Sequence, residues 1–312
     1  MTALICGSVA YDTIMVFSGR FSEHILADKI HMLNVSFLVP QLRREFGGCA
    51  GNIAYNLNQL GGKGYPMATA GRDFQSYSDW MKRCGIDCRY IHRLDDEFTA
   101  QAYITTDLDD NQITAFHPGA MNRSALNHVP GDAGISVGVI SPDGRDGMLL
   151  HAEEFADAGI PFMFDPGQGL PMFSGAELRR FVELATWVTV NDYEGELLSQ
   201  RTGWAPAEIS ERVDALVVTR GGKGSVIYLQ GNRLDIPVTP VDEPLDPTGC
   251  GDAYRAGLLF GLMNDCGWET TGRIASLMGA IKIESHGTQN HTITPEAFRQ
   301  RYKDSFGREL EI

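Results

Sequence analysis

The stretch Asp246-Pro-Thr-Gly-Cys-Gly-Asp252 runs directly into an apolar segment, residues 251–264, that is expected to be a helix. Gly249, Cys250 and Gly251 offer backbone N–H groups with little side-chain obstruction where this helix begins. A helix N-terminus favours an anion, because its first N–H groups are unpaired and the helix dipole is positive there. Asp252 adds an ionised carboxylate in the first turn. Such a segment can supply an anion hole and a proton acceptor, which phosphoryl transfer needs; taken alone, Asp252 also fits a simple helix cap.

Short apolar runs alternate with helical patterns around this segment, which predicts an α/β fold. Strands are expected at 3–9, 137–141, 160–165, 187–191 and 215–219, helices at 50–60, 145–158, 175–186 and 270–284, and a hairpin at 225–229 with 233–238. Two segments, 11–46 and 99–117, do not follow this alternation of strands and helices. Both contain β-prone stretches, and the second has a polar turn at 107–111. We therefore expect a Rossmann-like three-layer core with a mostly parallel sheet (1–10, 47–98 and 118–312) and a small β lid (11–46 and 99–117).

Composition limits the partners of the chain. The net charge of −14 over 312 residues repels a nucleic-acid backbone and an anionic membrane surface. No stretch approaches the roughly 18 apolar residues of a membrane span, and the first residues do not resemble a signal peptide. The six cysteines show neither C-x-x-C nor a zinc-like spacing, so we expect reduced thiols in a cytoplasmic protein.

The 246–252 stretch resembles the signature of the ribokinase-like (PfkB) carbohydrate and nucleoside kinases, roughly D-T-x-G-A-G-D. Pro247 and Cys250 replace the usual Thr and Ala, whereas the glycines and both aspartates are kept. The resemblance implies that Asp252 is the general base and that the N–H groups of 249–252 form the anion hole. In many relatives, Asp246 and the carbonyl of Thr248 belong to a monovalent-cation site, as for K⁺. The distal loop here, 287–291 (GTQNH), is not a close match to the family.

Two more stretches match the acceptor side of that family. Gly7-Ser-Val-Ala-Tyr-Asp12 matches its first strand, which ends in an Asp that grips vicinal ribose hydroxyls. Phe46-Gly-Gly-Cys-Ala-Gly-Asn52 matches G-G-x-x-x-N at a helix start. The resemblance implies that Gly47 and Gly48 let the backbone approach the sugar closely and that Asn52 bonds a sugar hydroxyl.

The nucleotide side is implied by two further stretches. Asn191-Asp-Tyr-Glu194 matches the family motif N-x-x-E, in which the Glu orients hydrated Mg²⁺ and the Asn supports the triphosphate of ATP. An acidic helix start would give the same letters. The strand end 219–224 (TRGGKG) is neither a Walker A loop nor a dinucleotide fingerprint. By resemblance it contributes to the ATP site, whose expected residues are Asn191, Thr219, Arg220, Gly222 and Gly224.

Two details favour a nucleoside as the phosphoryl acceptor. Phe164-Asp-Pro-Gly-Gln168 is similar to the D-P-G-Q stretch of prokaryotic nucleoside and adenosine kinases, whereas free-sugar kinases tend to have D-x-N-x-R. Phe116 and His117 end the lid segment and could stack on and bond to a base, although Phe116 also fits the lid's own core. No Lys/Arg cluster suits a phosphosugar. We predict transfer from MgATP to the ribose 5′-hydroxyl, with Asp12, Gly47, Gly48, Asn52, Phe116 and Gln168 at the acceptor site.

Two alternatives stay open at this point. The first is ribokinase or another free-sugar kinase, because one fold hosts several acceptors. The second is a ligand-binding regulator that kept the fold and lost turnover. The preferred base and the oligomeric state are not readable from the sequence, although the β-edges of the lid could pair two copies into a homodimer.

Overall fold

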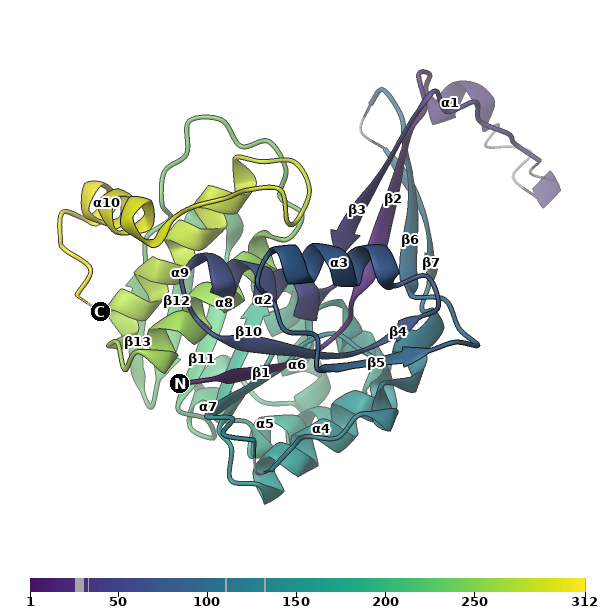
Figure 1. Ribbon diagram of the computed structural model, residues 1–312. Helices are drawn as coiled ribbons and strands as arrows, with labels where there is room; N and C mark the ends of the chain where they lie inside the picture. The colour runs from purple at the N-terminus through teal and green to yellow at the C-terminus, as the bar shows by residue number, and fades with distance from the viewer. Residues whose placement is uncertain (26–30, 33, 110, 132, 312) are drawn as a thin grey trace.

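The computed structural model describes residues 1–25, 31–32, 34–109, 111–131 and 133–311 (Figure 1). Residues 26–30 and 33 of the expected lid, residue 110 of its expected turn, and residues 132 and 312 of the expected core lie outside the described residues.

A nine-stranded sheet forms the centre of the part of the chain that the structure describes. Its order is β13-β12-β11-β10-β9-β8-β1-β4-β5. The strands are β1 (Ala3–Cys6), β4 (Gly64–Gly71), β5 (Tyr90–Leu94), β8 (Val137–Ile140), β9 (Phe162–Phe164), β10 (Trp187–Asn191), β11 (Ala215–Thr219), β12 (Ser225–Leu229) and β13 (Asn232–Ile236). Seven run parallel, and the β12–β13 hairpin is antiparallel at one edge.

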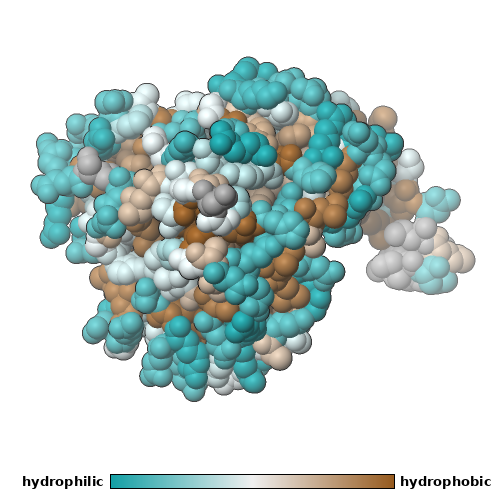
Figure 2. All heavy atoms as spheres, turned by 60° about the horizontal axis from the view of Figure 1, so that its bottom comes forward, coloured by the Kyte–Doolittle hydropathy of each residue, from teal (hydrophilic) through white to brown (hydrophobic). Residues whose placement is uncertain are grey.

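Helices cover both faces of this sheet, so a strand inside it, such as β1, can be apolar along its whole length. One face carries α2 (Cys49–Gln59), α3 (Gln75–Arg83), α8 (Cys250–Met263) and α9 (Trp268–Ile283), and the other carries α4 (Arg145–Asp157), α5 (Gly175–Leu184), α6 (Asp192–Thr202) and α7 (Pro206–Ser210). Helix α10 (Pro295–Phe306) packs on α9. No helix among the described residues is long and apolar enough to cross a bilayer. On the underside of the core, hydrophilic side chains surround smaller apolar areas (Figure 2).

The order of the strands reverses at β1, because the chain first adds β4 and β5 on one side and later adds β8 to β11 on the other. In open α/β sheets, ligands bind outside the carboxyl ends of the strands at such a switch point. The loops after β1 and β8 are joined there, since Ser8 N–H donates to the carbonyl of Pro142 at 3.1 Å. This geometry places the ligand crevice at the end of the sheet from which the small sheet rises.

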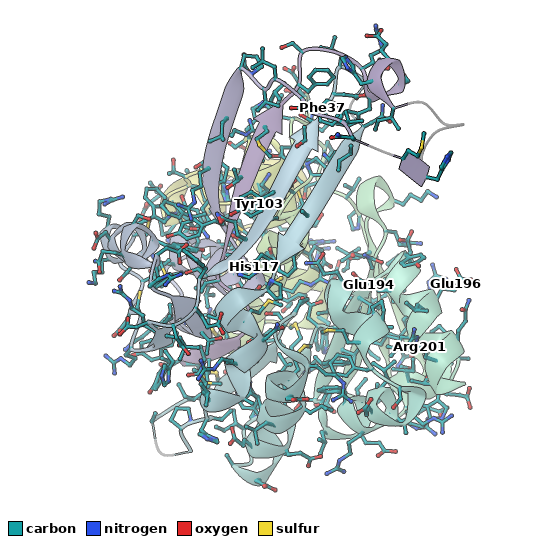
Figure 3. The ribbon with its side chains drawn as sticks, turned by 90° about the vertical axis from the view of Figure 1, so that its right-hand side faces the viewer. Phe37, Tyr103, His117, Glu194, Glu196 and Arg201 are labelled. Atoms are coloured by element: carbon teal, nitrogen blue, oxygen red, sulfur yellow. The ribbon has the colours of Figure 1, made fainter. Side chains whose placement is uncertain are left out.

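The small sheet has the order β3-β2-β6-β7 and stands away from the core (Figure 1). Its strands are β2 (Ala10–Val16), β3 (Gln41–Gly47), β6 (Ala100–Thr106) and β7 (Gln112–His117). The β2–β6 pair is parallel and the other two pairs are antiparallel. His117 lies at the core end of this sheet and Phe37 lies at its far end (Figure 3).

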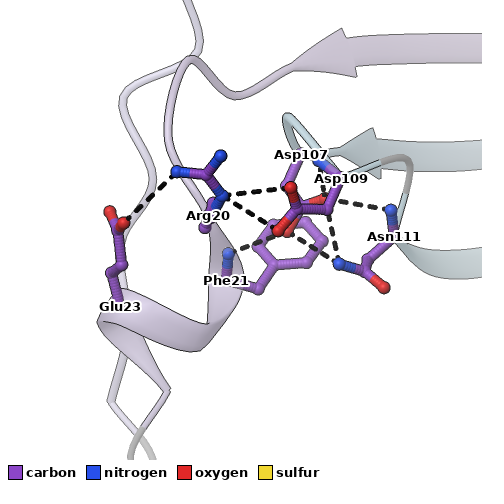
Figure 4. A network of polar contacts seen from close by, with 6 residues as sticks. All are labelled: Arg20, Phe21, Glu23, Asp107, Asp109 and Asn111. Carbon is purple, nitrogen blue, oxygen red and sulfur yellow. Dashed lines mark hydrogen bonds and ion pairs between the residues drawn. The ribbon is translucent and has the colours of Figure 1, made fainter.

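The far end of the small sheet is held together by two carboxylates, Asp107 and Asp109 (Figure 4). Asp107 accepts the backbone N–H groups of Phe21, Asp109 and Asn111 at 2.9 to 3.0 Å. Arg20 donates from its Nε to both carboxylate oxygens of Asp109 at 3.0 Å. These bonds join α1 (Phe21–His24) to the β6–β7 turn.

The predicted α/β architecture, with a mostly parallel central sheet and a small additional β-sheet, is confirmed. The expected strands at 187–191 and 215–219 have the predicted ends, and the expected helices begin and end within a few residues of those observed. Strands β4 and β5 and helices α3, α7 and α10 were not predicted from the sequence. The division of the chain into 1–10, 47–98 and 118–312 as core, and 11–46 and 99–117 as lid, stays a prediction.

Gly48 gives the first testable prediction, because it joins the small sheet to α2 at a φ of 86°. A Cβ there would lie 2.6 Å from the carbonyl oxygen of Ser8 and 2.7 Å from the backbone nitrogen of Ala10. We expect Gly48→Ala to lower the free energy of unfolding by about 3 kcal/mol, from backbone strain and this clash together. Urea unfolding measures the change.

Gly61→Ala is the matched control, since Gly61 has a φ of 83° and the nearest atom to its added Cβ is 4.0 Å away. Only the strain of the left-handed backbone, about 1 kcal/mol, is expected there. Equal losses in the two variants would contradict the close approach described at Gly48.

Candidate active site

Helix α8 begins at the Gly-rich stretch that the sequence analysis singled out. Gly249 is its N-cap in a left-handed conformation, and Asp252 is the third helical residue. The N–H of Cys250 donates to the carbonyl of Pro247 at 3.1 Å. No carbonyl of the described residues accepts the N–H of Gly249 or Gly251. The N–H of Asp252 also has no carbonyl acceptor within the described ranges, so three backbone donors and the positive end of the helix dipole remain for an anion beside the Asp252 carboxylate.

A cavity of about 770 Å³ opens in front of this helix start. Ten of the predicted site residues line it: Gln168, Asn191, Glu194, Thr219, Gly222, Gly224, Gly249, Cys250, Gly251 and Asp252. The apolar wall of the cavity, which was not predicted from the sequence, includes Val238, Val241, Ala280 and Ile283. The sequence does contain apolar residues on both sides of the 246–252 stretch, and these could have indicated such a wall. A cavity with one apolar wall and one wall of backbone N–H groups has the chemistry of a nucleotide site.

The carboxylate of Asp252 is held by one side-chain amide. Asn52 donates from Nδ2 to Oδ2 of Asp252 at 2.8 Å, and its own Oδ1 accepts from Gln289 Nε2 at 2.9 Å. Gln289 Oε1 in turn accepts from the indole Nε1 of Trp80 at 2.9 Å. An indole N–H can only donate, so the orientation of both amides follows: Gln289 must turn its carbonyl to Trp80, and Asn52 must turn its amino group to Asp252.

Several charges set the ionisation of Asp252. Burial raises its pKa to about 6, the hydrogen bond from Asn52 opposes that rise, Asp165 adds to it and Arg255 lowers it. Cys49 also faces this carboxylate, and Tyr77 and Cys250 lie within its field. Asp252 is thus a carboxylate with a pKa near the lower end of the physiological range, as a general base requires.

Arg255 is a buried cation among three carboxylates, one turn after Asp252 on α8. It donates to both oxygens of Asp165 at 3.0 and 2.8 Å, and its Nη2 lies 4.0 Å from Glu194 Oε2. A buried ion pair with two parallel bonds fixes both partners. The loop after β9, which carries Asp165 and Gln168, is therefore anchored to α8. Arg255 was not predicted from the sequence.

Asn191 and Glu194 form a reciprocal cap at the start of α6. Glu194 N–H donates to Asn191 Oδ1, and Asn191 N–H donates to Glu194 Oε2, both at 2.7 Å. Figure 3 shows Glu194 on α6. Glu194 also lines the cavity, and its side chain is 15% exposed. No cluster of three or more His, Cys, Asp or Glu that could hold a metal occurs among the described residues. Glu194 fits Mg²⁺ only as one of its ligands, with phosphate oxygens and water completing the shell.

Asp246, one of the two predicted monovalent-cation residues, has protein partners at its carboxylate and at its carbonyl group. Asp246 accepts the backbone N–H groups of Thr248 and Gly287 at its two carboxylate oxygens, both at 2.9 Å. Its carbonyl oxygen accepts from the ammonium group of Lys282 at 2.7 Å. A resident cation already contacts this site, so the residues do not fit a bound K⁺ ion at that carbonyl.

Five of the six predicted acceptor residues, Asp12, Gly47, Gly48, Asn52 and Phe116, gather at the base of the small sheet outside the cavity lining, whereas Gln168 lines the cavity. Strand pairing puts Glu45, Asp12, Ala102 and Phe116 in one row across the sheet, so their side chains share a face. Burial raises the pKa of Asp12 to about 6, with Glu45 and Asp246 adding to the rise. The nearness of Asp246 indicates that this face turns toward the start of α8, although Phe116 is 51% exposed.

The predicted ATP-site residues at the strand end 219–224 do not all lie at the cavity. Thr219, Gly222 and Gly224 line the cavity, whereas Arg220 donates to the carboxylate of Asp235 at 3.3 Å and is not among the lining residues. All six cysteines are free thiols, as expected. The roles assigned to the individual site residues stay predictions.

Known proteins resemble the chain over most of its length. Residues 8–295 match the pfkB family carbohydrate kinases. The nucleoside kinase of Methanocaldococcus jannaschii is 32% identical over 263 residues, which are 84% of this chain and 86% of the relative. The solved structure of Burkholderia thailandensis nucleoside kinase in complex with inosine has 53% identity and a TM-score of 0.89, covering 98% of this chain and 99% of that one.

The same Burkholderia enzyme in complex with ADP-inosine has a TM-score of 0.87 and 53% identity, and covers 99% of this chain and 97% of that chain. A ribokinase from Thermotoga maritima, at 17% identity and a TM-score of 0.79 over 97% of this chain and 99% of its own, shares the fold. The family implied by the 246–252 stretch is confirmed, and the chain belongs to the pfkB family of carbohydrate kinases.

Proposed function

We propose that the chain is an ATP-dependent nucleoside kinase that transfers the γ-phosphoryl group of MgATP to the ribose 5′-hydroxyl of a nucleoside. One observation carries the proposal: Asp252, with a pKa of about 6, stands on the cavity wall at the start of α8, beside unpaired backbone N–H groups. A base and an anion hole then meet at one point. The Burkholderia enzyme described with inosine and with ADP-inosine, at 53% identity, supports a nucleoside as acceptor.

In the proposed reaction, Asp252 lies between the nucleotide and the acceptor. The nucleotide lies in the 770 Å³ cavity, with its base against the apolar wall and its phosphates toward α8. Asp252 accepts the proton of the 5′-hydroxyl as that oxygen bonds to the γ-phosphorus, while the bond from phosphorus to the β–γ bridging oxygen breaks and ADP leaves. The N–H groups of Gly249 and Gly251 stabilise charge on the transferring group. Mg²⁺, held in part by Glu194, supplies neutralisation of the phosphate charge when bound.

The acceptor side suits a ribose that carries a base. Asp12 can accept bonds from two ribose hydroxyls, and the second hydrogen of the Asn52 amino group remains for a further one. Phe116 lies two strands from Asp12 in the same row, about 10 Å away at the usual strand spacing. A nucleoside spans such a distance and a free sugar does not. Gln168, next to the cavity, is proposed to contact the acceptor, and the lid is proposed to close over it and exclude water.

A panel of acceptors tests the proposal. With MgATP, we expect ADP release to depend on adenosine, inosine or cytidine and not on ribose or fructose, because only nucleosides reach both ends of the row. Release with free ribose would support a sugar kinase instead. Tight nucleoside binding without ADP release would support a regulator that lost turnover.

Pairing of two lids is a further part of the proposal. The edge strands β3 and β7 are mostly exposed, and unpaired strand edges invite pairing. Light scattering after size exclusion should give the mass of a dimer; a monomer at micromolar concentration would contradict it.

Asp252→Asn tests the base directly. The amide keeps the shape of the side chain and cannot accept the proton, so we expect kcat to fall by about 10²–10⁴-fold while nucleoside affinity changes little. Steady-state kinetics and calorimetric binding measure the two quantities. Asp157→Asn, at an exposed carboxylate ending α4, is the control and should match the wild type. Near-normal turnover of Asp252→Asn would refute the assigned role.

The pH dependence of kcat/KM tests how Asp252 is held. Asp252 acts when ionised, so activity should be lost as the pH falls through about 6, the pKa of this raised carboxyl group. Gln289→Met removes the donor that orients Asn52, so the amide of Asn52 can turn its oxygen to Asp252. We expect the acidic limb to move up by about one pH unit, the scale of one charge-assisted hydrogen bond.

Asn56→Leu is the matched control for that shift. Asn56 is a buried amide one turn along α2 that bonds to the Asn52 carbonyl and to His291, outside the Trp80–Gln289–Asn52 chain. Its loss should lower stability and leave the acidic limb in place. An unmoved limb in Gln289→Met would show that the orientation of Asn52 does not set the pKa of Asp252.

A further inference from the structure

Lys282 is the only lysine of the described part of the chain that is fully buried. It lies in the last turn of α9, and its ammonium group donates to the carbonyl oxygens of Asp246 at 2.7 Å and Ser285 at 3.0 Å. No carboxylate among the described residues forms an ion pair with it. Removing an ammonium group from water is costly, so a lysine held by carbonyl groups alone needs an explanation.

The two carbonyl groups belong to the loops that meet behind the catalytic stretch. The N–H groups of Leu245 and Asp246 donate to the carbonyl of Ile283 at 2.8 and 3.1 Å. Gly287 N–H donates to the carboxylate of Asp246 at 2.9 Å. Lys282 thus stands at the junction of the 245–248 loop with the 284–287 loop, which is the place where the family resemblance implies a monovalent cation.

We propose that the ammonium group of Lys282 is a built-in replacement for that monovalent cation, so that the enzyme holds its catalytic loop in place without bound potassium. The inference rests on the kinase function proposed above only for its effect on turnover. The contacts themselves belong to the described residues whatever the acceptor is.

An alkali ion and the ammonium group of Lys282 interact with carbonyl oxygens in a similar way. A desolvated alkali ion in a protein is held by several carbonyl oxygens that replace its water shell. An ammonium group carries the same single charge and points up to three N–H donors at such oxygens. Lys282 is also tethered to α9, so its local concentration at the carbonyl groups does not depend on the salt in solution. Its position suits the negative end of that helix as well.

A nearby carboxylate opposes the effect of burial on the pKa of Lys282. Burial lowers the pKa of Lys282, while the negative charge of Asp246 acts in the opposite direction. The carboxylate of Asp246 is therefore placed to keep the ammonium group charged although it does not pair with it. Asp246 at the same time fixes the first residues of the loop that leads to Gly249 and Asp252, through its bond to Thr248 N–H.

The first experiment is a salt titration of the wild-type enzyme. Turnover with MgATP and inosine, and the thermal unfolding midpoint, are measured in KCl and in tetramethylammonium chloride of equal ionic strength. We expect both quantities to be the same in the two salts. Activation by KCl together with a higher midpoint in KCl would overturn the proposal.

The second experiment removes the ammonium group of Lys282, so that the site depends on added potassium. Lys282→Met keeps the length and the apolar stem and removes the charge, so the Asp246 and Ser285 carbonyl groups lose their donor. Without potassium, we expect kcat/KM to fall by about tenfold, the scale of one charge-assisted hydrogen bond. KCl should restore part of the activity and raise the unfolding midpoint, since an ion that binds only the folded state stabilises it.

Lys82→Met is the matched control, because Lys82 is exposed on α3 away from the site. It should behave as the wild type in both salts.

Wild-type activity of Lys282→Met without potassium, or loss of activity with no response of the midpoint to KCl, would contradict the proposal. If Lys282→Met does not fold in either salt, the wild-type titration decides alone. Absence of nucleoside-dependent turnover in the wild type would refute the proposed function, whereas the midpoints still test Lys282.

Discussion

The hydrogen bond from Asn52 to Asp252 is the constraint on which the site depends. It joins two helix starts that are 200 positions apart in the sequence, that of α2 after two strands of the small sheet and that of α8 after the Gly-rich stretch. One carboxylate thereby belongs to both halves of the site. Asp252 lines the cavity at the start of α8, and the row of small-sheet residues that contains Asp12 lies outside that lining. A phosphoryl group that moves between two substrates needs such a shared point.

Charge is balanced around that point by burial and by cations fixed in the fold. A chain with a net charge of −14 has to bind a triphosphate against its own field. Arg255 neutralises Asp165 and faces Glu194, while Lys282 supplies a second buried cation behind the 246–252 stretch. The unpaired N–H groups at the start of α8 add partial positive charge where the phosphates are expected. Local donors and buried cations do what the overall charge of the protein cannot.

Much of the fold follows from local pattern, and the parts that do not are non-local. Strand 215–219 has the expected ends because a short apolar run between turn residues has few other solutions. Strand β4 was missed because Pro66 argues against a central strand, yet it pairs with Ile5 inside the sheet. The catalytic stretch could be found from spacing, since its glycines and aspartates are adjacent. Gln289 and Lys282 could not, because Gln289 meets a partner 237 positions away and Lys282 looks like any lysine on an amphipathic helix.

The central claim is that Asp252 takes the proton of a nucleoside hydroxyl, and a crystal structure with a nucleoside and a non-hydrolysable ATP analogue tests it most directly. The account predicts the 5′-oxygen at about 2.6–3.2 Å from a carboxylate oxygen of Asp252, in line with the γ-phosphorus, with the triphosphate against Gly249 and Gly251. A 5′-oxygen held by another side chain, with Asp252 turned away from both substrates, would contradict it.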